Sequence, residues 1–425
     1  MGVHVRKLFA EQLISGNGSS PLDSLVEQLW QAPLASGDVR VVLNPGHSEE
    51  WRDVERYWVL PSIAHPRMLI PRGNSKVTAA ALLSYRALRT PKVRLGRSAL
   101  GWAAACGLPP SAGTLSVQQR SSQGTTPVLP LAEMSRAVGV GPLSAAIGIR
   151  LGDNRKPTLQ LFDQAGRAVG YAKLAWNESS RGYIETEREA LVSLAGGSAQ
   201  MRVPELAGEG NWDGYPYLIS TPLPAGVQAV RGRVSQPTEQ ELYALCDIYR
   251  QGPVSQTAHF SSLSQRLAGL PDSAGMNLRQ LTNEVEHLLR ERNAHLPVSR
   301  RWHGDMVPWN MARDRDGALW CWDWETSEPD AVAGLDAWHW AVSVRRESRG
   351  SFSPDDWIAA GNDIQPYLAA AAIPRSAWPD VAAVYALVVT ERAWNLATAN
   401  GDWASSWLSP EDLGHILNKV SKDLS

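Results

Sequence analysis

Cysteine is scarce in this sequence, with three residues in 425, at Cys106, Cys246 and Cys321. They are widely separated, form no Cys-x-x-Cys pair and have no histidine at metal-ligand spacing. This pattern argues against a disulfide framework or a zinc site. We therefore expect reduced thiols in a cytoplasmic protein.

The sequence also lacks an excess of charge and any long apolar run. Lys and Arg number 41 against 43 for Asp and Glu, a formal net charge of -2. No general positive field is available to bind nucleic acid, so no nucleic-acid partner is expected. No apolar stretch approaches the length of a membrane span, and none follows the basic residues near the N-terminus. We expect neither a membrane partner nor a secretory signal.

The first 125 residues carry no chemical motif. Apolar patterning predicts a small mixed α/β region, in which residues 116–126, rich in Ser, Gly, Thr and Gln, form a loop or linker. Its role is open, with capping of a binding site, extension of the following lobe and dimerisation as alternatives. Its expected elements are helices at 21–31, 77–88 and 98–106 and strands at 39–43, 57–60 and 67–70.

The remainder predicts an α+β fold in two parts. Residues 140–222 alternate as strands, with turn residues between 144–151, 158–162 and 168–176, which favours an antiparallel sheet with a helix at 185–194. Residues 223–425 are mostly helical in pattern. The predicted order is a small sheet lobe followed by a helical lobe.

Three polar residues stand in apolar surroundings in HGDMVPWNMARDRDGALWCWDWE, namely Asp305, Asn310 and Asp323. The dipeptide Asp316-Gly317 is typical of a two-residue hairpin turn. Pairing about that turn predicts Asn310 opposite Asp323, where an amide oxygen and a carboxylate would bind one Mg²⁺. Asp305 precedes the hairpin and is placed to receive a proton. These are the parts that phosphoryl transfer needs.

The same residues carry a family resemblance. His303-Gly304-Asp305 with Asn310, followed by Asp323-Trp324-Glu325, resembles the catalytic loop and metal motif of the aminoglycoside phosphotransferase family. The resemblance covers residues 140–400 and implies a protein-kinase-like two-lobed fold that uses ATP and Mg²⁺. It implies Asp305 as the catalytic base, Asn310 and Asp323 as metal ligands, and Asp336 as a brace of the loop. His303 is expected to be structural, bonded to the nearby backbone.

The resemblance also implies a lysine in the sheet, paired with a glutamate on the following helix. Lys173 lies in the third predicted strand, where an ammonium among apolar neighbours needs a partner. Glu187 is the favoured partner, and Glu185 and Glu189 remain alternatives.

In this fold the connection between the first two strands covers the nucleotide phosphates. Here it contains one glycine, Gly152, so the side chains of Asn154, Arg155 and Lys156 are candidates to bind phosphate. An exposed basic turn is the equal alternative. Residues 220–224 would form the hinge beside the adenine.

The leading hypothesis is a kinase that transfers the γ-phosphate of Mg·ATP to a hydroxyl of a small polar acceptor, sugar-like or aminoglycoside-like. Asp330, Glu347 and Asp355 are candidate acceptor-side acids. The alternative is a nucleotide-binding pseudokinase scaffold whose N-terminal region docks a partner. A Ser/Thr protein kinase is disfavoured, because the segment between Asp323 and Asp336 is too short for an activation segment. The sequence does not indicate the acceptor, the choice of ATP over GTP or the oligomeric state.

Overall fold

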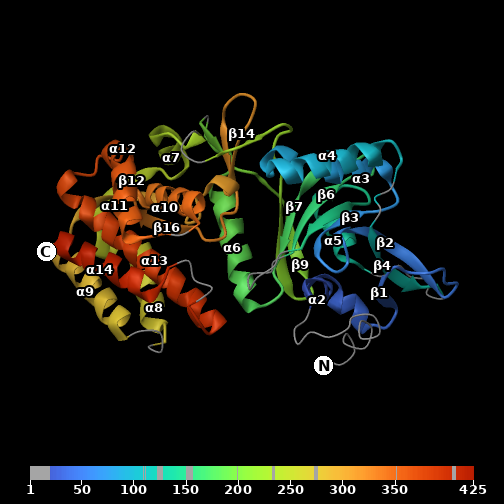
Figure 1. The fold of residues 1–425 in the computed structure, drawn as a ribbon, viewed down its shortest axis with the longest axis horizontal. Helices are drawn as coiled ribbons and strands as arrows, with labels where there is room; N and C mark the ends of the chain where they lie inside the picture. The colour runs from blue at the N-terminus through green and yellow to red at the C-terminus, as the bar shows by residue number, and fades with distance from the viewer. Residues whose placement is uncertain are drawn as a thin grey trace. The chain divides into compact units, whose positions relative to one another are not determined.

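The computed structural model describes residues 20–425, except 109, 111, 122–127, 150–156, 199, 232–234, 272–275, 351 and 404–407. The chain divides into two compact units (Figure 1). Unit 1 contains the described residues up to Leu83 together with Ser98–Ser180 and Gly208–Ile219. Unit 2 contains Ser84–Arg97, Arg181–Ala207 and Ser220–Ser425.

Unit 1 is built on a nine-stranded sheet with the order β1-β4-β2-β3-β5-β6-β7-β10-β9. The pairings from β1 to β7 are antiparallel. The predicted α+β class with an antiparallel sheet is confirmed. The strands are β1 (Val39–Leu43), β2 (Trp51–Pro61), β3 (Pro66–Pro71), β4 (Gly113–Arg120), β5 (Ser144–Gly148), β6 (Thr158–Phe162), β7 (Ala168–Leu174), β9 (Leu206–Trp212) and β10 (Tyr215–Ser220).

Strands from the N-terminal region and strands of the predicted sheet lobe share this one sheet. The link is the pairing of β3 with β5, in which Met68 faces Gly148 and Leu69 faces Ile147. The strands of the N-terminal region therefore extend the sheet that contains β5, β6 and β7. The order β5-β6-β7 agrees with the three strands that turn chemistry predicted.

The prediction of a loop over residues 116–126 is wrong for residues 116–120, which belong to β4. Their polar side chains are satisfied by neighbouring strands. Gln118 accepts a hydrogen bond from Arg40 Nε at 2.9 Å and donates one to Asp53 at 2.8 Å. Gln119 accepts one from Arg52, also at 2.9 Å. Cross-strand partners thus replace the water that such a polar segment would otherwise require.

Helices cover both faces of this sheet (Figure 1). Residues of α3 (Ser75–Leu83) and the end of α4 (Pro91–Ala105) join a buried cluster with Ile70, Ala146 and Phe162. On the other face α2 (Pro21–Ala35) packs against β1, and its Trp30 ring lies 6.2 Å from Tyr57. A shorter helix, α5 (Pro130–Val138), precedes β5.

Unit 2 is mostly helical, as predicted for residues 223–425. The central helix α13 (Trp378–Asn400) is buried along most of its length. The other helices are α6 (Glu178–Ser193), which begins in unit 1, α7 (Glu239–Leu245), α8 (Ala258–Gly269), α9 (Met276–Arg292), α10 (Leu335–Arg349), α11 (Pro354–Asp363), α12 (Gln365–Ala370) and α14 (Pro410–Leu424).

Two small sheets lie among these helices. One has the order β12-β13-β16, with β12 (Ile248–Pro253), β13 (His295–Trp302) and β16 (Glu328–Val332). The other has the order β11-β14-β15-β8, with β11 (Gln228–Ala229), β14 (Met311–Arg313), β15 (Leu319–Cys321) and β8 (Met201–Arg202). Short 3₁₀ turns are formed by η1 (Arg86–Leu88), η3 (Val254–Gln256), η5 (Pro308–Asn310) and η6 (Arg375–Ala377).

The predicted β14–β15 hairpin exists, but its register is shifted by one residue. Met311 pairs with Cys321, and Asn310 lies opposite Trp322, whose N–H donates to the Asn310 carbonyl at 3.1 Å. The turn has three residues instead of two, because Asp314 Oδ1 accepts from the N–H groups of residues 316 and 318, both at 3.0 Å. The predicted pairing of Asn310 with Asp323 is therefore wrong.

Within the part of the chain that the structure describes, no helix is both long and apolar enough to cross a membrane.

Candidate active site

The loop after β13 carries the predicted catalytic residues and is held by Asp336 in the first turn of α10. The Asp336 side chain is 2% exposed and accepts hydrogen bonds from the backbone N–H groups of His303 (2.9 Å) and Gly304 (3.1 Å). Gly304 has a φ of 83°, and a Cβ there would lie 2.3 Å from the Thr326 carbonyl oxygen. Glycine is needed at this position, and Asp336 braces the loop as the resemblance implied.

His303 is buried, and both ring nitrogens bond to the backbone. Nε2 lies 3.0 Å from the carbonyl oxygen of Trp322, and Nδ1 lies 3.1 Å from the amide nitrogen of Asp305. Because a carbonyl accepts and an amide N–H donates, we assign the ring proton to Nε2. Burial lowers the pKa of His303, which favours this neutral ring. The expectation of a structural histidine is confirmed.

The Asp305 carboxylate is held from two sides. Asn310 Nδ2 donates to Oδ2 at 2.9 Å and to the Asp305 carbonyl at 3.0 Å. His339 Nε2 lies 3.1 Å from Oδ1, and its Nδ1 lies 3.1 Å from the Tyr385 hydroxyl. Although burial alone would raise it, the hydrogen bond and charge of His339 hold the pKa of Asp305 well below its usual value. The result is an oriented carboxylate that is still 37% exposed.

Two residues that support this loop were missed by sequence reasoning, namely His339 on α10 and Arg392 on α13. Arg392 Nη1 donates to the Gly304 carbonyl at 2.6 Å, and its guanidinium lies over the ring of Trp302. His339 and Asp305 are 34 residues apart, and Arg392 and Gly304 are 88 apart. No local pattern joins positions so distant, so only the fold reveals these contacts.

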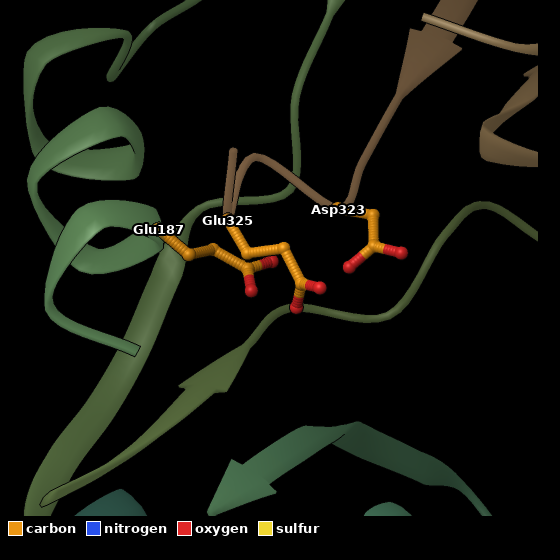
Figure 2. A group of neighbouring side chains, drawn as sticks. All are labelled: Glu187, Asp323 and Glu325. Carbon is orange, nitrogen blue, oxygen red and sulfur yellow. The ribbon is translucent and has the colours of Figure 1, made fainter. Parts of the chain in front are cut away.

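A second group of acidic residues lies in unit 2 (Figure 2). Glu187 comes from α6, and Asp323 and Glu325 come from the segment after β15. Their carboxylate oxygens lie within 4.8 Å of one another and point toward a common centre. Asp323 adopts the left-handed conformation, with a φ of 72°. Carboxylate oxygens at this spacing are the donor set that a hard divalent cation such as Mg²⁺ prefers.

The structure brings Asn310 to Asp305, and Asp323 to Glu187 and Glu325. Since the Asn310 amide nitrogen donates to Asp305, its side-chain oxygen is the atom left to bind a cation. Glu325 was quoted in the sequence motif but not assigned as a ligand. Its position two residues after Asp323 is the signal that could have found it.

Lys173 and its candidate partners lie in different units. Lys173 is in β7 of unit 1, opposite Thr158 of β6. Among the glutamates of α6 in unit 2, Glu187 is 3% exposed, whereas Glu185 and Glu189 are exposed. A buried carboxylate needs hydrogen bonds or a cation more than an exposed one does. Burial therefore favours Glu187, and its pairing with Lys173 stays a prediction.

The three candidate phosphate-binding residues Asn154, Arg155 and Lys156 lie outside the described residues.

Asp330, one of the candidate acceptor-side acids, is engaged by neighbouring groups. Its carboxylate accepts from the Tyr249 hydroxyl, from Arg250 Nη2 at 2.7 Å and from the Ala258 N–H at 2.7 Å. These contacts tie β12, α8 and β16 together, so Asp330 stabilises the fold.

No protein-family model and no curated protein matches the sequence. Among solved structures, a choline/ethanolamine kinase family protein from Mesorhizobium loti is 15% identical, with a TM-score of 0.40 over 66% of this chain and 93% of that one. The choline kinase LicA from Streptococcus pneumoniae is 13% identical, with a TM-score of 0.39 over 64% and 91%. The amicoumacin kinase hAmiN is 13% identical, with a TM-score of 0.43 over 64% and 87%. The names of all three of these structures are those of kinases or of a kinase family.

Proposed function

We propose that this protein is a phosphotransferase with a protein-kinase-like catalytic domain, which moves the γ-phosphate of ATP to a hydroxyl group of a small polar acceptor. The observation that carries the proposal is the Asp305 carboxylate, which is oriented by Asn310 and His339 and yet partly exposed. A rigid carboxylate that an incoming hydroxyl can reach is what this chemistry requires.

In the proposed reaction, the acceptor hydroxyl donates a hydrogen bond to Asp305. Its oxygen then forms a bond to the γ-phosphorus while the bond from phosphorus to the bridging oxygen breaks. ADP leaves with that electron pair, and the hydroxyl proton passes to Asp305. Because such transition states are loose, orientation of the hydroxyl contributes more than the basicity of the carboxylate.

The carboxylates of Asp323 and Glu325, which lie within 4.8 Å of each other and of Glu187, fit Mg²⁺, which prefers a few carboxylate or amide oxygens and fills its other positions with water and phosphate. The side-chain oxygen of Asn310 is proposed as a further ligand, as the family resemblance implies. A bound Mg²⁺ would neutralise charge on the ATP phosphates. Lys173, with Glu187 as its partner, is the proposed contact to the phosphates, and the side chains of Asn154, Arg155 and Lys156 are proposed to bind them as well.

The acceptor proposed from the family resemblance is carbohydrate-like. An enzyme that consumes ATP and has three free cysteines belongs in the cytoplasm, which is the proposed compartment.

The test is transfer of labelled γ-phosphate from ATP into fractions of a bacterial small-metabolite extract. We expect Asp305→Asn to lower transfer by about 100-fold or more, the scale of general-base catalysis, with nucleotide binding retained. Asp323→Ala should also abolish the Mg²⁺ dependence of ATP binding. Asp316→Asn, a change in the exposed hairpin turn, is the matched control and should behave as wild type.

If Asp305→Asn transferred phosphate at the wild-type rate, the assignment of Asp305 as the catalytic base would be wrong. Mg²⁺-dependent ATP binding without transfer to any fraction would favour the pseudokinase scaffold, with the N-terminal region as its docking element.

A further inference from the structure

A cavity of about 780 Å³ in unit 2 lies beside the loop that carries Asp305. Pro308 and Trp309, from the 3₁₀ turn η5, form part of its wall. The third residue of that turn, Asn310, donates to the Asp305 carboxylate. The turn that forms part of the wall is therefore hydrogen-bonded to the Asp305 carboxylate. The volume is in the range of small-molecule sites.

Another part of the wall comes from the N-terminal region. Leu88, Arg89, Thr90 and Pro91 line the cavity, and they belong to unit 2 although unit 1 contains the chain on either side of them. The segment is anchored by Tyr85, whose hydroxyl donates to the Leu223 carbonyl at 2.6 Å, and by packing of η1 against β11. These four residues complete the wall of the cavity. This part of the N-terminal region, which carries no sequence motif, therefore has a role in the proposed binding site.

The cavity lining contains more cationic than anionic side chains. It contains the guanidinium groups of Arg89, Arg231, Arg345 and Arg349 against a single carboxylate, that of Glu347. Arg345 is paired with Asp363, and Arg349 with the buried Asp356.

Two of these guanidinium groups are not neutralised in this way. Within the described ranges of the chain, neither Arg89 nor Arg231 has an ion-pair partner, and both are exposed. Arginine forks match the geometry of carboxylates and phosphates and bind them with charge-assisted hydrogen bonds.

On the basis of the proposed function, we propose that this cavity binds the acceptor and that the acceptor carries an anionic group, carboxylate or phosphate, besides the hydroxyl to be phosphorylated. Arg89 and Arg231 bind the anionic group. Trp309, whose side chain is 51% exposed, offers an apolar face on which a sugar or other ring stacks.

This charge pattern separates the protein from an aminoglycoside kinase in substrate preference. An acceptor with several ammonium groups would meet the guanidinium groups of Arg89 and Arg231, which have no ion-pair partner among the described residues, and like charges in a partly enclosed site repel. The acceptor is therefore of opposite charge to the one that the family resemblance implies.

The experiment is calorimetric titration of the full chain with four hexoses that share one ring and differ in charge. The probes are D-glucuronate, D-glucose 6-phosphate, D-glucose and D-glucosamine. We expect the two anionic probes to bind at least about tenfold more tightly than glucose, and glucosamine to bind least. The two anionic probes distinguish a carboxylate from a phosphate as the preferred group.

Arg89→Gln and Arg231→Gln should each reduce the ratio of glucuronate to glucose affinity about tenfold, equivalent to about 1.4 kcal/mol. Arg67→Gln, which removes an exposed guanidinium in β3 outside the cavity, should leave the ratio unchanged. The inference is overturned by glucose or glucosamine binding as tightly as the anions, by variants that keep the wild-type ratio, or by no measurable binding of either anion.

Calorimetry reads binding without phosphate transfer, so this test is independent of the labelled-phosphate assay. Loss of the predicted preference overturns the cavity assignment even where transfer succeeds. A preference that depends on Arg89 and Arg231 supports it even where transfer fails.

Discussion

Replacing Asp336 tests the brace of the catalytic loop. Its carboxylate accepts from two buried backbone N–H groups, those of His303 and Gly304, and from the Cys246 thiol. An unsatisfied buried donor costs about 1–3 kcal/mol. Removal of a buried carboxylate offsets part of this cost. We expect Asp336→Ala to lower the free energy of unfolding by about 3 kcal/mol, and Asp336→Asn, which keeps one accepting oxygen, by about half as much.

The assay combines urea unfolding of the full chain, followed by tryptophan fluorescence, with hydrogen exchange of the loop. In Asp336→Ala the amides of His303 and Gly304 should lose protection before those of β13, because they lose their acceptor. Asp316→Ala, in the exposed hairpin turn, is the control for the loss of an aspartate. An unfolding free energy for Asp336→Ala within about 0.5 kcal/mol of wild type, with unchanged exchange at both amides, would refute the reasoning.

Two further changes test residues outside the motif between His303 and Glu325. His339→Ala should lower kcat about tenfold or more, because it releases the Asp305 carboxylate. Tyr385→Phe should have a smaller effect on kcat, and His339→Gln should retain part of the rate that His339→Ala loses. Equal kcat values for wild type and His339→Ala would contradict this role of His339. In unit 1, burial raises the pKa of Glu55 to about 7 despite the hydrogen bond from Tyr57. The native state then binds more protons than the unfolded state between about pH 4.5 and pH 7, so stability should fall as pH rises, by at most about 3 kcal/mol. Glu55→Gln should remove this component in urea unfolding at several pH values, and an identical pH dependence would exclude it.

The parts of the fold that the sequence predicted are those that local chemistry determines. The turns between β5, β6 and β7 contain Asp, Asn and Gly, and the strands between them are apolar, so their order and antiparallel pairing follow from short-range rules. The helical character of residues 223–425, which include the long helix α13, was predicted in the same way, from helical spacing of apolar residues.

The parts that the sequence did not predict depend on distant partners. The sequence of β4 is polar and so has the pattern of a linker, but its buried glutamines form hydrogen bonds with Arg40, Arg52 and Asp53. In the sequence, nothing distinguishes His339 from other polar residues of a helix. Its contact with Asp305 exists only because the fold places α10 beside the loop after β13. In both cases the interaction that explains the residue joins positions far apart in the chain. The periodicity of apolar residues in the sequence contains no information about such contacts.

The metal-ligand prediction was based on a hairpin register that the structure contradicts. Pairing about Asp316-Gly317 was meant to set Asp323 opposite Asn310, but a slip of one residue turns every strand side chain to the other face. In the structure β15 ends at Cys321, and the left-handed backbone of Asp323 aims its carboxylate at Glu187 and Glu325.

This conformation decides which substitution tests the carboxylate of Asp323. Asparagine adopts a positive φ readily, whereas alanine at a φ of 72° is strained by about 1–2 kcal/mol. Asp323→Asn should therefore unfold like wild type in urea and still lose Mg²⁺-dependent ATP binding. Asp323→Ala should lose both binding and about 1 kcal/mol of stability. If Asp323→Asn kept its Mg²⁺ dependence while Asp323→Ala lost it, the defect of the alanine variant would come from the backbone, and the carboxylate would not be a metal ligand.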